Sequence, residues 1–363
     1  MRVLLICPRS NVFLNFRKKL VEKLQELGHT VCGLAFDNDK EEEVKSKNIE
    51  FYYFKDANRG LNPFKILTLK KRYARAIEKI KPDLILTFML KPNIYGVLGA
   101  KTAGCDNIYA MVEGAGDVFI NNGIKWKLIR KVVCMGYKKA FKHSKKAFFL
   151  NKDDKTEFVN RGLVKDEQCE IVPGIGIDLE RFEYQPIENA TTFLMIARLL
   201  KTKGVYEYCE AAKIVKEKYP NAIFNLVGPE GTIKAEDLTE YTEQGIINYL
   251  GETSDVRPFI KECGVYVLPS YREGFSVSVM EAQAVGRAVI TCDTNGTRDA
   301  VDNGYNGFLV PVKDSKSLAE KMIYFLENPD RIYEMGENAR KYAEENFHQK
   351  VINEKICKII GAM

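Results

Sequence analysis

The sequence predicts an α/β protein made of two doubly wound domains, each built around a parallel sheet, and three observations lead to this prediction. The chain has 363 residues, which is too long for one ordinary core and suits two domains of about 150–200 residues each. Short runs of continuous apolar residues alternate with amphipathic helical patterns, as expected when helices cover both faces of a parallel sheet. This alternation occurs twice, on either side of Pro173 and Gly174.

The first series opens as a strand–helix–strand unit. Apolar residues recur at helical spacing from Phe16 to Leu27, and Gly28 ends that helix before the next apolar run. The pattern then repeats along the first half of the chain. Strands are expected at 3–6, 31–35, 50–54, 84–88 and 108–112, and helices at 16–27, 63–80 and 93–103.

The second series follows Pro173 and ends with a helix that is apolar on one side. Strands are expected at 192–197, 223–228, 265–269 and 288–291, and helices at 204–218, from Val277 onward and at 353–360. We therefore expect an N-terminal domain over 1–172 and a C-terminal domain over 173–346. The final segment, 347–363, is expected to pack back on the N-terminal domain.

The composition argues against several classes of protein. With 45% apolar and 29% charged residues, the chain does not look disordered, collagen-like or membrane-spanning. No apolar run approaches the roughly 20 residues of a transmembrane helix, and the N-terminus lacks a signal-peptide pattern, so a cytoplasmic location is expected. The nine cysteines form no C-x-x-C pair and the three histidines are scattered, so neither disulfides nor a zinc site is expected.

The net charge of +6 is unevenly divided. Residues 1–172 hold 33 Lys and Arg against 20 Asp and Glu, a net +13, whereas residues 173–363 hold 22 against 29, a net −7. A basic N-terminal half indicates a surface that meets something anionic, such as a phosphorylated substrate, an acidic lipid surface or nucleic acid.

The strongest motif lies in the run from Leu268 to Ala282, where an apolar strand is followed by a glycine-containing loop and a helix. Ser276 is expected to cap that helix, whose free N-terminal amides favour an anion. Glu273 in the loop and Glu281 eight residues later can reach one elongated ligand at two points. The alternative is a solvated loop carboxylate and a surface helix carboxylate.

Two further motifs follow strands of the second series. Arg198 directly follows the strand at 192–197 and Lys203 precedes the next helix, a pair of cations suited to a diphosphate leaving group. An ordinary basic loop is the alternative. Gly228 ends the strand at 223–228, where it permits close approach of the backbone to a base or ribose.

In the first series, Glu113 follows an apolar strand and is flanked by glycine. It is either a catalytic or acceptor-binding group, or a loop carboxylate held by backbone amides. The chain has no G-x-G-x-x-G after its first strand and no G-x-x-x-x-G-K-[ST] motif. Dehydrogenase and P-loop functions therefore have no support.

Three segments together resemble the retaining glycosyltransferases of family 4. They are I-A-R-L-L-K-T-K-G, E-G-F-S-V-S-V-M-E and N-G-Y-N-G-F-L-V-P-V-K-D-S-K-S-L-A-E. Two more, L-N-P-F and A-M-V-E-G-A-G-D-V-F-I-N-N-G, resemble members that extend saccharides linked to undecaprenyl diphosphate in N-glycan, O-antigen and capsule assembly. The resemblance implies the GT-B architecture, in which two Rossmann-like domains face each other across a cleft.

The resemblance also implies roles for single residues. Arg198 and Lys203 match the pair that binds the donor diphosphate, Glu273 matches the acid that contacts the donor sugar, and Glu281 matches the acid that binds the ribose. Gly274, Phe275 and Ser276 match the loop and helix-end contacts to the donor. The family is thought to react without a metal, so no cofactor besides the nucleotide-sugar donor is implied.

Two positions depart from the family pattern. Many members carry a histidine where this chain has Glu113, so Glu113 either accepts the acceptor proton or anchors the acceptor sugar. A glutamate common after the last C-terminal strand is replaced here by the shorter Asp299.

Two basic stretches of the N-terminal half suit a membrane partner. Residues 125–146 contain nine Lys or Arg and no acid, with Trp126, Tyr137, Phe141 and aliphatic residues between them, and residues 59–81 contain eight cations and one acid. A basic amphipathic helix binds anionic membrane surfaces. The alternative is a core-packing helix with a solvated basic face.

We therefore expect a retaining glycosyltransferase, peripheral on the inner face of the cell membrane, whose N-terminal domain binds acceptor and membrane. It is expected to move a hexose or N-acetylhexosamine, with GalNAc as first choice, from UDP to an undecaprenyl-diphosphate-linked saccharide. Alternatives are a GT-B UDP-sugar 2-epimerase and a transferase of O-antigen or capsule assembly with another donor sugar. A nucleic-acid-binding module lacks a recognisable motif.

Overall fold

The computed structural model describes residues 1–55, 63–114, 116–120 and 123–363. Parts of the motifs at 61–64 and 110–123, and of the basic stretch 59–81, lie outside these residues. The chain divides into two compact units. The N-terminal domain comprises Met1–Val172 with Lys350–Met363, and the C-terminal domain comprises Pro173–Gln349.

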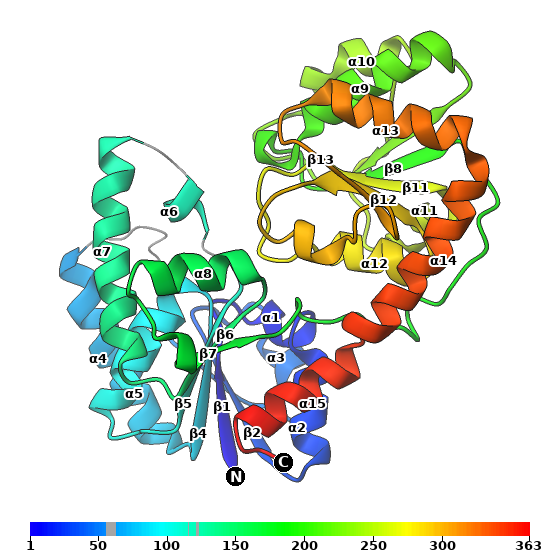
Figure 1. Ribbon diagram of the computed structural model, residues 1–363. Coiled ribbons are helices and arrows are strands. Elements are labelled where there is room, and N and C mark those ends of the chain that lie inside the picture. Colours follow the sequence, from blue (N-terminus) through cyan, green and yellow to red (C-terminus); the bar gives the residue numbers. More distant parts are fainter. Residues whose placement is uncertain (56–62, 115, 121–122) are drawn as a thin grey trace. The chain divides into compact units, whose positions relative to one another are not determined.

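The N-terminal domain is built on a seven-stranded parallel sheet with the order β3-β2-β1-β4-β5-β6-β7 (Figure 1). Its strands are β1 (Arg2–Ile6), β2 (Thr30–Ala35), β3 (Glu50–Tyr53), β4 (Leu84–Phe88), β5 (Ile108–Val112), β6 (Lys146–Phe149) and β7 (Cys169–Ile171). Its helices are α1 (Asn11–Leu14), α2 (Lys18–Glu26), α3 (Glu41–Lys45), α4 (Pro63–Ile80), η1 (Pro92–Gly96), α5 (Val97–Thr102), α6 (Asp117–Ile120), α7 (Ile124–Phe141), α8 (Lys152–Asn160), η2 (Asp166–Gln168) and α15 (Gln349–Ile359).

Helices cover both faces of this sheet, because its central strands are mostly apolar and are buried along their whole length. All five residues of β4 and of β5 are buried. The helices α4, η1, α5 and α7 pack together as one layer, and α2 lies against β2 with α15 beside it (Figure 1). The imidazole Nε2 of His29 lies 2.8 Å from the carbonyl oxygen of Ala362, and Lys23 pairs with Glu354 at 3.6 Å, which fixes the end of the chain to this domain.

The helix expected at 93–103 is divided into a π-helical turn, η1, and α5. Asn93 in this turn is fully buried. Its side-chain oxygen accepts a hydrogen bond from the Thr87 hydroxyl at 2.8 Å, and its amide donates to the carbonyl of Met111 at 2.8 Å. The turn is thereby tied to the ends of β4 and β5, and π-helical turns are often found at functional sites.

The C-terminal domain is built on a six-stranded parallel sheet with the order β10-β9-β8-β11-β12-β13. Its strands are β8 (Thr192–Ile196), β9 (Ile223–Val227), β10 (Asn248–Tyr249), β11 (Val265–Leu268), β12 (Ala288–Cys292) and β13 (Gly307–Val310). Its helices are η3 (Lys201–Lys203), α9 (Val205–Lys218), η4 (Ala235–Leu238), α10 (Thr239–Glu243), α11 (Arg257–Glu262), α12 (Val277–Val285), η5 (Arg298–Ala300), α13 (Ser315–Glu327) and α14 (Pro329–Asn346).

Two helical layers enclose this sheet as well. The helices α9 and α13 pack together on one face, and α11, α12 and α14 pack on the other (Figure 1). Residues 347–349 also belong to this domain, because the Phe347 ring lies 5.4 Å from the rings of Phe275 and Tyr342 and Ile177 bridges to His348. Both domains are doubly wound, which confirms the predicted fold class.

In the part of the chain that the structure describes, no helix is both long enough and apolar enough to cross a bilayer.

Candidate active site

The order of the C-terminal sheet creates a switch point between β8 and β11. The strand β8 has β9 on one side and β11 on the other, so the loops that follow β8 and β11 leave the sheet in opposite directions. Ligands of doubly wound domains bind at this point, beyond the carboxyl ends of the strands. The loop after β8 carries Arg198 and Lys203, and the loop after β11 carries Glu273.

The structure brings Lys203 and Glu273 into direct contact. The Nζ atom of Lys203 lies 2.5 Å from Oε1 of Glu273, and the two side chains are 28% and 13% exposed. Two hydrogen bonds to the Thr202 carbonyl hold the loops together: the Tyr271 amide donates to it at 2.9 Å, and the Ser270 hydroxyl donates to it at 3.2 Å. The Lys203–Glu273 contact is a charge-assisted hydrogen bond in a partly desolvated environment.

Two glycines allow this edge of the sheet to pack closely. Gly204 has a φ of +75°, and a Cβ atom there would lie 2.1 Å from the carbonyl oxygen of Pro269. Gly228 has a φ of +147°, and its Cβ would lie 2.0 Å from the carbonyl oxygen of Ala197. The close approach that the sequence predicts at Gly228 is therefore made to the chain's own backbone after β8.

The helix α12 begins as the sequence predicts. Ser276 is its N-cap, and the Ser276 hydroxyl accepts a hydrogen bond from the Val279 amide at 3.3 Å. Phe275 is 7% exposed and packs its ring against Phe347. Phe275 therefore anchors the loop through its side chain.

Glu281 lies in the second turn of α12 and is partly exposed. Burial among protein atoms raises the pKa of its carboxyl group to about 7. Arg181 opposes this shift and Asp255 adds to it. The side chain can therefore change its charge close to neutral pH.

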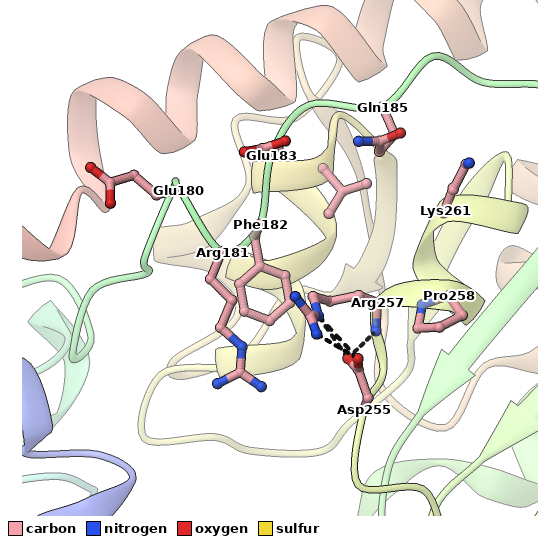
Figure 2. A pocket seen from close by; sticks show the side chains of 10 residues that line it. Glu180, Arg181, Phe182, Glu183, Gln185, Asp255, Arg257, Pro258 and Lys261 are labelled. Atoms are coloured by element: carbon pink, nitrogen blue, oxygen red, sulfur yellow. Dashed lines mark hydrogen bonds and ion pairs between the residues drawn. The ribbon is translucent and has the colours of Figure 1, made fainter.

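Arg181 and Asp255 line an open cavity of about 540 Å³ (Figure 2). Figure 2 shows Asp255 held by Arg257, with Nε to Oδ1 at 2.8 Å and Nη2 to Oδ2 at 2.7 Å, and these bonds lower the pKa of Asp255 to about 2. None of the site residues predicted from sequence lines this cavity. The sequence did not predict its charged lining residues, because Arg181 and Asp255 lie in loops without a recognisable motif.

Arg198 and Asp299 occupy the same edge of the sheet. Arg198 is exposed, directly after β8, and Asp299 is partly exposed in η5, after β12. Their part in the site rests on their position beyond the carboxyl ends of β8 and β12, the strands on either side of β11.

The N-terminal sheet has its own switch point, between β1 and β4. Arg17, which follows β1 and α1, places its guanidinium 4.2 Å from the centre of the Phe88 ring at the end of β4. The same guanidinium forms an ion pair with Glu113 at the end of β5. The sequence predicted Glu113 as a site residue but gave no signal for Arg17, whose partner lies far along the chain.

Comparison with known proteins identifies two matching family models. Residues 176–342 match the model described as glycosyl transferases group 1. Residues 2–142 match the model described as glycosyl transferase 4-like.

Curated relatives match over long stretches. The N,N'-diacetylbacillosaminyl-diphospho-undecaprenol alpha-1,3-N-acetylgalactosaminyltransferase of Campylobacter jejuni is 30% identical over 359 residues, which cover 95% of this chain and 94% of the relative. The UDP-Gal:alpha-D-GlcNAc-diphosphoundecaprenol alpha-1,3-galactosyltransferase of Escherichia coli is 26% identical over 292 residues, which cover 76% of this chain and 74% of the relative.

Solved structures agree in fold. A glycosyltransferase from Rickettsia africae aligns with a TM-score of 0.78 and 20% identity over 99% of this chain and 97% of its own. HepE of Anabaena, crystallised with UDP and glucose, aligns with a TM-score of 0.79 and 16% identity over the whole of both chains. These structural alignments establish the two-domain GT-B fold. The family models in both domains, and a relative 30% identical along almost the whole chain, show that this protein is a glycosyltransferase of family 4, group 1.

Proposed function

We propose that the protein transfers a hexose or N-acetylhexosamine, with GalNAc as first choice, from a UDP-sugar to an undecaprenyl-diphosphate-linked saccharide, with retention of configuration. The relatives from Campylobacter jejuni and Escherichia coli are both named for transfer to a sugar on diphosphoundecaprenol, which supports this acceptor class. UDP in the HepE complex supports this nucleotide. Membership of a transferase family disfavours the 2-epimerase alternative.

The observation that carries the proposal is the Lys203–Glu273 pair at the switch point of the C-terminal sheet. An ammonium group beside a carboxylate offers the two partners that a nucleotide sugar needs. In the proposal, Lys203 together with Arg198 neutralises the diphosphate, whose negative charge grows as the glycosidic bond breaks. Glu273 accepts hydrogen bonds from hydroxyl groups of the donor sugar.

The elements around the pair complete the donor site in this proposal. The N-terminus of α12 carries the positive end of the helix dipole, and its free amides, with the backbone of Gly274 and Phe275 and the cap residue Ser276, face the diphosphate. Glu281 accepts hydrogen bonds from the ribose, and Gly228 borders the base. Asp299 contributes a shorter acid than most family members.

The test is a transfer assay with the purified protein, a panel of UDP-sugars and short-chain polyprenyl-diphosphate-linked saccharides. We expect UDP release that depends on the acceptor, and a product whose new linkage keeps the donor's α configuration by NMR. An inverted product would overturn the retaining assignment. Conversion of the UDP-sugar to its 2-epimer without an acceptor would favour the epimerase, and transfer from another sugar would favour an O-antigen or capsule enzyme.

We propose peripheral attachment of the N-terminal domain to an anionic membrane through the outer face of α7. Trp126 is partly buried, and Tyr137 and Phe141 lie in the core against Phe158, so the aromatic residues expected at the surface do not form it. The exposed face instead combines three apolar and two basic side chains at helical spacing. They are Ile124, Leu128 and Met135, which are 89%, 65% and 56% exposed, and Lys131 and Lys138. Lys142, at the C-cap of the helix, and Lys145, beyond its end, are also exposed.

The second basic stretch adds cations to the same proposal. Lys71, Arg75 and Lys79 of α4 are exposed, whereas Arg72 is held by the carbonyl of Lys55 at 2.7 Å and stacks on Phe54. Each exposed cation near an anionic surface contributes about 1 kcal/mol. The inner face of the cell membrane, where the acceptor lipid would be presented to a cytoplasmic enzyme, is the proposed location.

A further inference from the structure

The carboxyl edge of the N-terminal sheet holds a buried ion pair that the donor site does not explain. Arg17 is 2% exposed, pairs with Glu113 and stacks on Phe88. Burial lowers the pKa of Arg17 only to about 10, so the guanidinium stays charged at neutral pH. A buried charge is costly unless it is paired, and Arg17 and Glu113 therefore keep each other in place.

This pair differs from a purely structural buried arginine in the same chain. Arg287 is fully buried, and its guanidinium donates to backbone carbonyls that include those of Ile260 and Gln185, at 2.9 and 2.6 Å. Arg17 Nε and Glu113 Oε2, in contrast, have no hydrogen-bond partner among the described residues. The Glu113 side chain as a whole is 14% exposed, but Oε2 is itself buried. A buried acceptor oxygen without a partner is costly, and a hydroxyl group of a ligand at this edge of the sheet could supply the missing hydrogen bond.

The residues that flank the pair suit a saccharide. Phe16, next to Arg17, is 43% exposed, and Met89, next to Phe88, is 39% exposed. Met89 is held at a φ of +67°, a strained conformation for a residue with a side chain, and such strain is concentrated at functional sites. These exposed apolar side chains follow strands of the same sheet edge as the buried charge, and such a combination suits a sugar ring, which has apolar faces and a polar rim.

We propose that Arg17 is a positioning residue for the acceptor: it fixes Glu113 as a carboxylate that accepts a hydrogen bond from a hydroxyl of the acceptor saccharide. A guanidinium in contact with a carboxylate favours its charged form, which makes Glu113 an anchor for the acceptor and a weak base. This inference rests on the proposed function and chooses between the two roles that the sequence left open for Glu113.

The test measures kcat and the KM of acceptor and donor for Arg17→Gln, Arg17→Lys, Glu113→Gln and the double variant R17Q/E113Q. We expect acceptor KM to rise about tenfold or more in each Gln variant, with donor KM unchanged and kcat less affected. The double variant should be no worse than either single one, and Arg17→Lys should recover part of the affinity. Arg2→Gln is the matched control, because Arg2 pairs with Glu50 at 2.8 Å at the opposite end of β1.

Three outcomes would contradict the inference. A fall in kcat with unchanged acceptor KM in Glu113→Gln would make Glu113 a base, and an unchanged acceptor KM in folded Arg17→Gln would remove Arg17 from the site. If Arg17→Gln fails to fold, the acceptor KM of the double variant, which leaves no unpaired buried charge, is the measurement that decides. An unchanged acceptor KM in that variant would contradict the inference. No transfer by the unmodified protein would overturn the proposed function and this inference with it.

Discussion

The ammonium group of Lys203 lies 2.5 Å from the carboxylate of Glu273, although the two residues are 70 positions apart in the chain. The contact joins the loops that follow the two strands at the switch point of the C-terminal sheet. Each side chain thus neutralises the charge of the other. In the proposed donor site, the nucleotide diphosphate would compete with Glu273 for Lys203, and the donor sugar would compete with Lys203 for Glu273.

Neutralising either member of the pair should reduce turnover strongly. We expect Lys203→Ala and Glu273→Gln each to lower kcat by about 100-fold or more, the usual loss when an electrostatic partner of a developing charge is removed. Lys218→Ala and Glu327→Gln are matched controls, because they form an equally short ion pair, 2.5 Å, on the surface of the same domain. Full activity of the two site variants would refute the site assignment.

Glu273→Gln should also bind UDP more tightly than the unmodified protein. Loss of the carboxylate frees the Lys203 ammonium for the diphosphate, so we expect Kd for UDP to fall severalfold while turnover falls. Isothermal titration calorimetry measures this directly. Weaker UDP binding in Glu273→Gln would mean that Glu273 itself holds the nucleotide.

The raised pKa of Glu281 predicts a pH-dependent stability. Because the folded pKa is about 7 and the ordinary value is 4.5, the unfolded chain releases this proton first, and the contribution of Glu281 to stability falls as pH rises from about 4.5 to 7. Glu281→Gln should therefore gain stability relative to the unmodified protein over this range, on the order of 1–3 kcal/mol. Thermal unfolding at several pH values measures the difference.

A surface variant provides the control for this pH series. Glu320 is exposed on α13, so the difference between Glu320→Gln and the unmodified protein should not change with pH. Arg181→Gln should move the transition of Glu281 to higher pH, because Arg181 opposes its shift. A constant effect of Glu281→Gln across the range would contradict the assignment.

Removing the exposed apolar residues of α7 should weaken membrane binding. We expect the triple variant of Ile124, Leu128 and Met135 to Ser to lose at least tenfold in affinity for anionic vesicles, because these side chains would be withdrawn from lipid. Val351→Ser, at a residue 56% exposed on α15, should leave binding unchanged. Sedimentation with phosphatidylglycerol vesicles, compared with phosphatidylcholine vesicles and with RNA, measures this. Equal binding by the triple variant, or preference for RNA, would refute this surface.

The sequence predicts the fold class well, because continuous apolar strands and amphipathic helices are local patterns. The cap at Ser276 is likewise local. Which face of α7 is buried is not a local property, because Tyr137 and Ile124 both belong to apolar sets at helical spacing. Only packing against α8 shows that Tyr137 is buried and Ile124 exposed.

The candidate sites show the same division. The Lys203–Glu273 contact follows from two local motifs once the order of β8 and β11 is known. Arg17 could not be found this way, because no motif surrounds it. Only the order of the strands in the sheet brings its partner, Glu113, close to it. Arg181 acts on Glu281 across a similar distance in sequence, and its effect depends on burial that no local pattern reports.

The close packing at Gly204 links stability to the position of Lys203. A Cβ at Gly204 would lie 2.1 Å from the Pro269 carbonyl oxygen, whereas Gly245, with a similar φ of +64°, has nothing within 4 Å. Gly245→Ala should cost only the backbone strain, about 1–2 kcal/mol. Gly204→Ala adds an overlap with backbone and should cost about 3 kcal/mol or more, with a loss of activity because the loop that carries Lys203 must shift. Chemical denaturation measures the loss of stability, and the transfer assay measures the loss of activity. Equal losses of stability in the two variants would show that close packing against Pro269 contributes nothing.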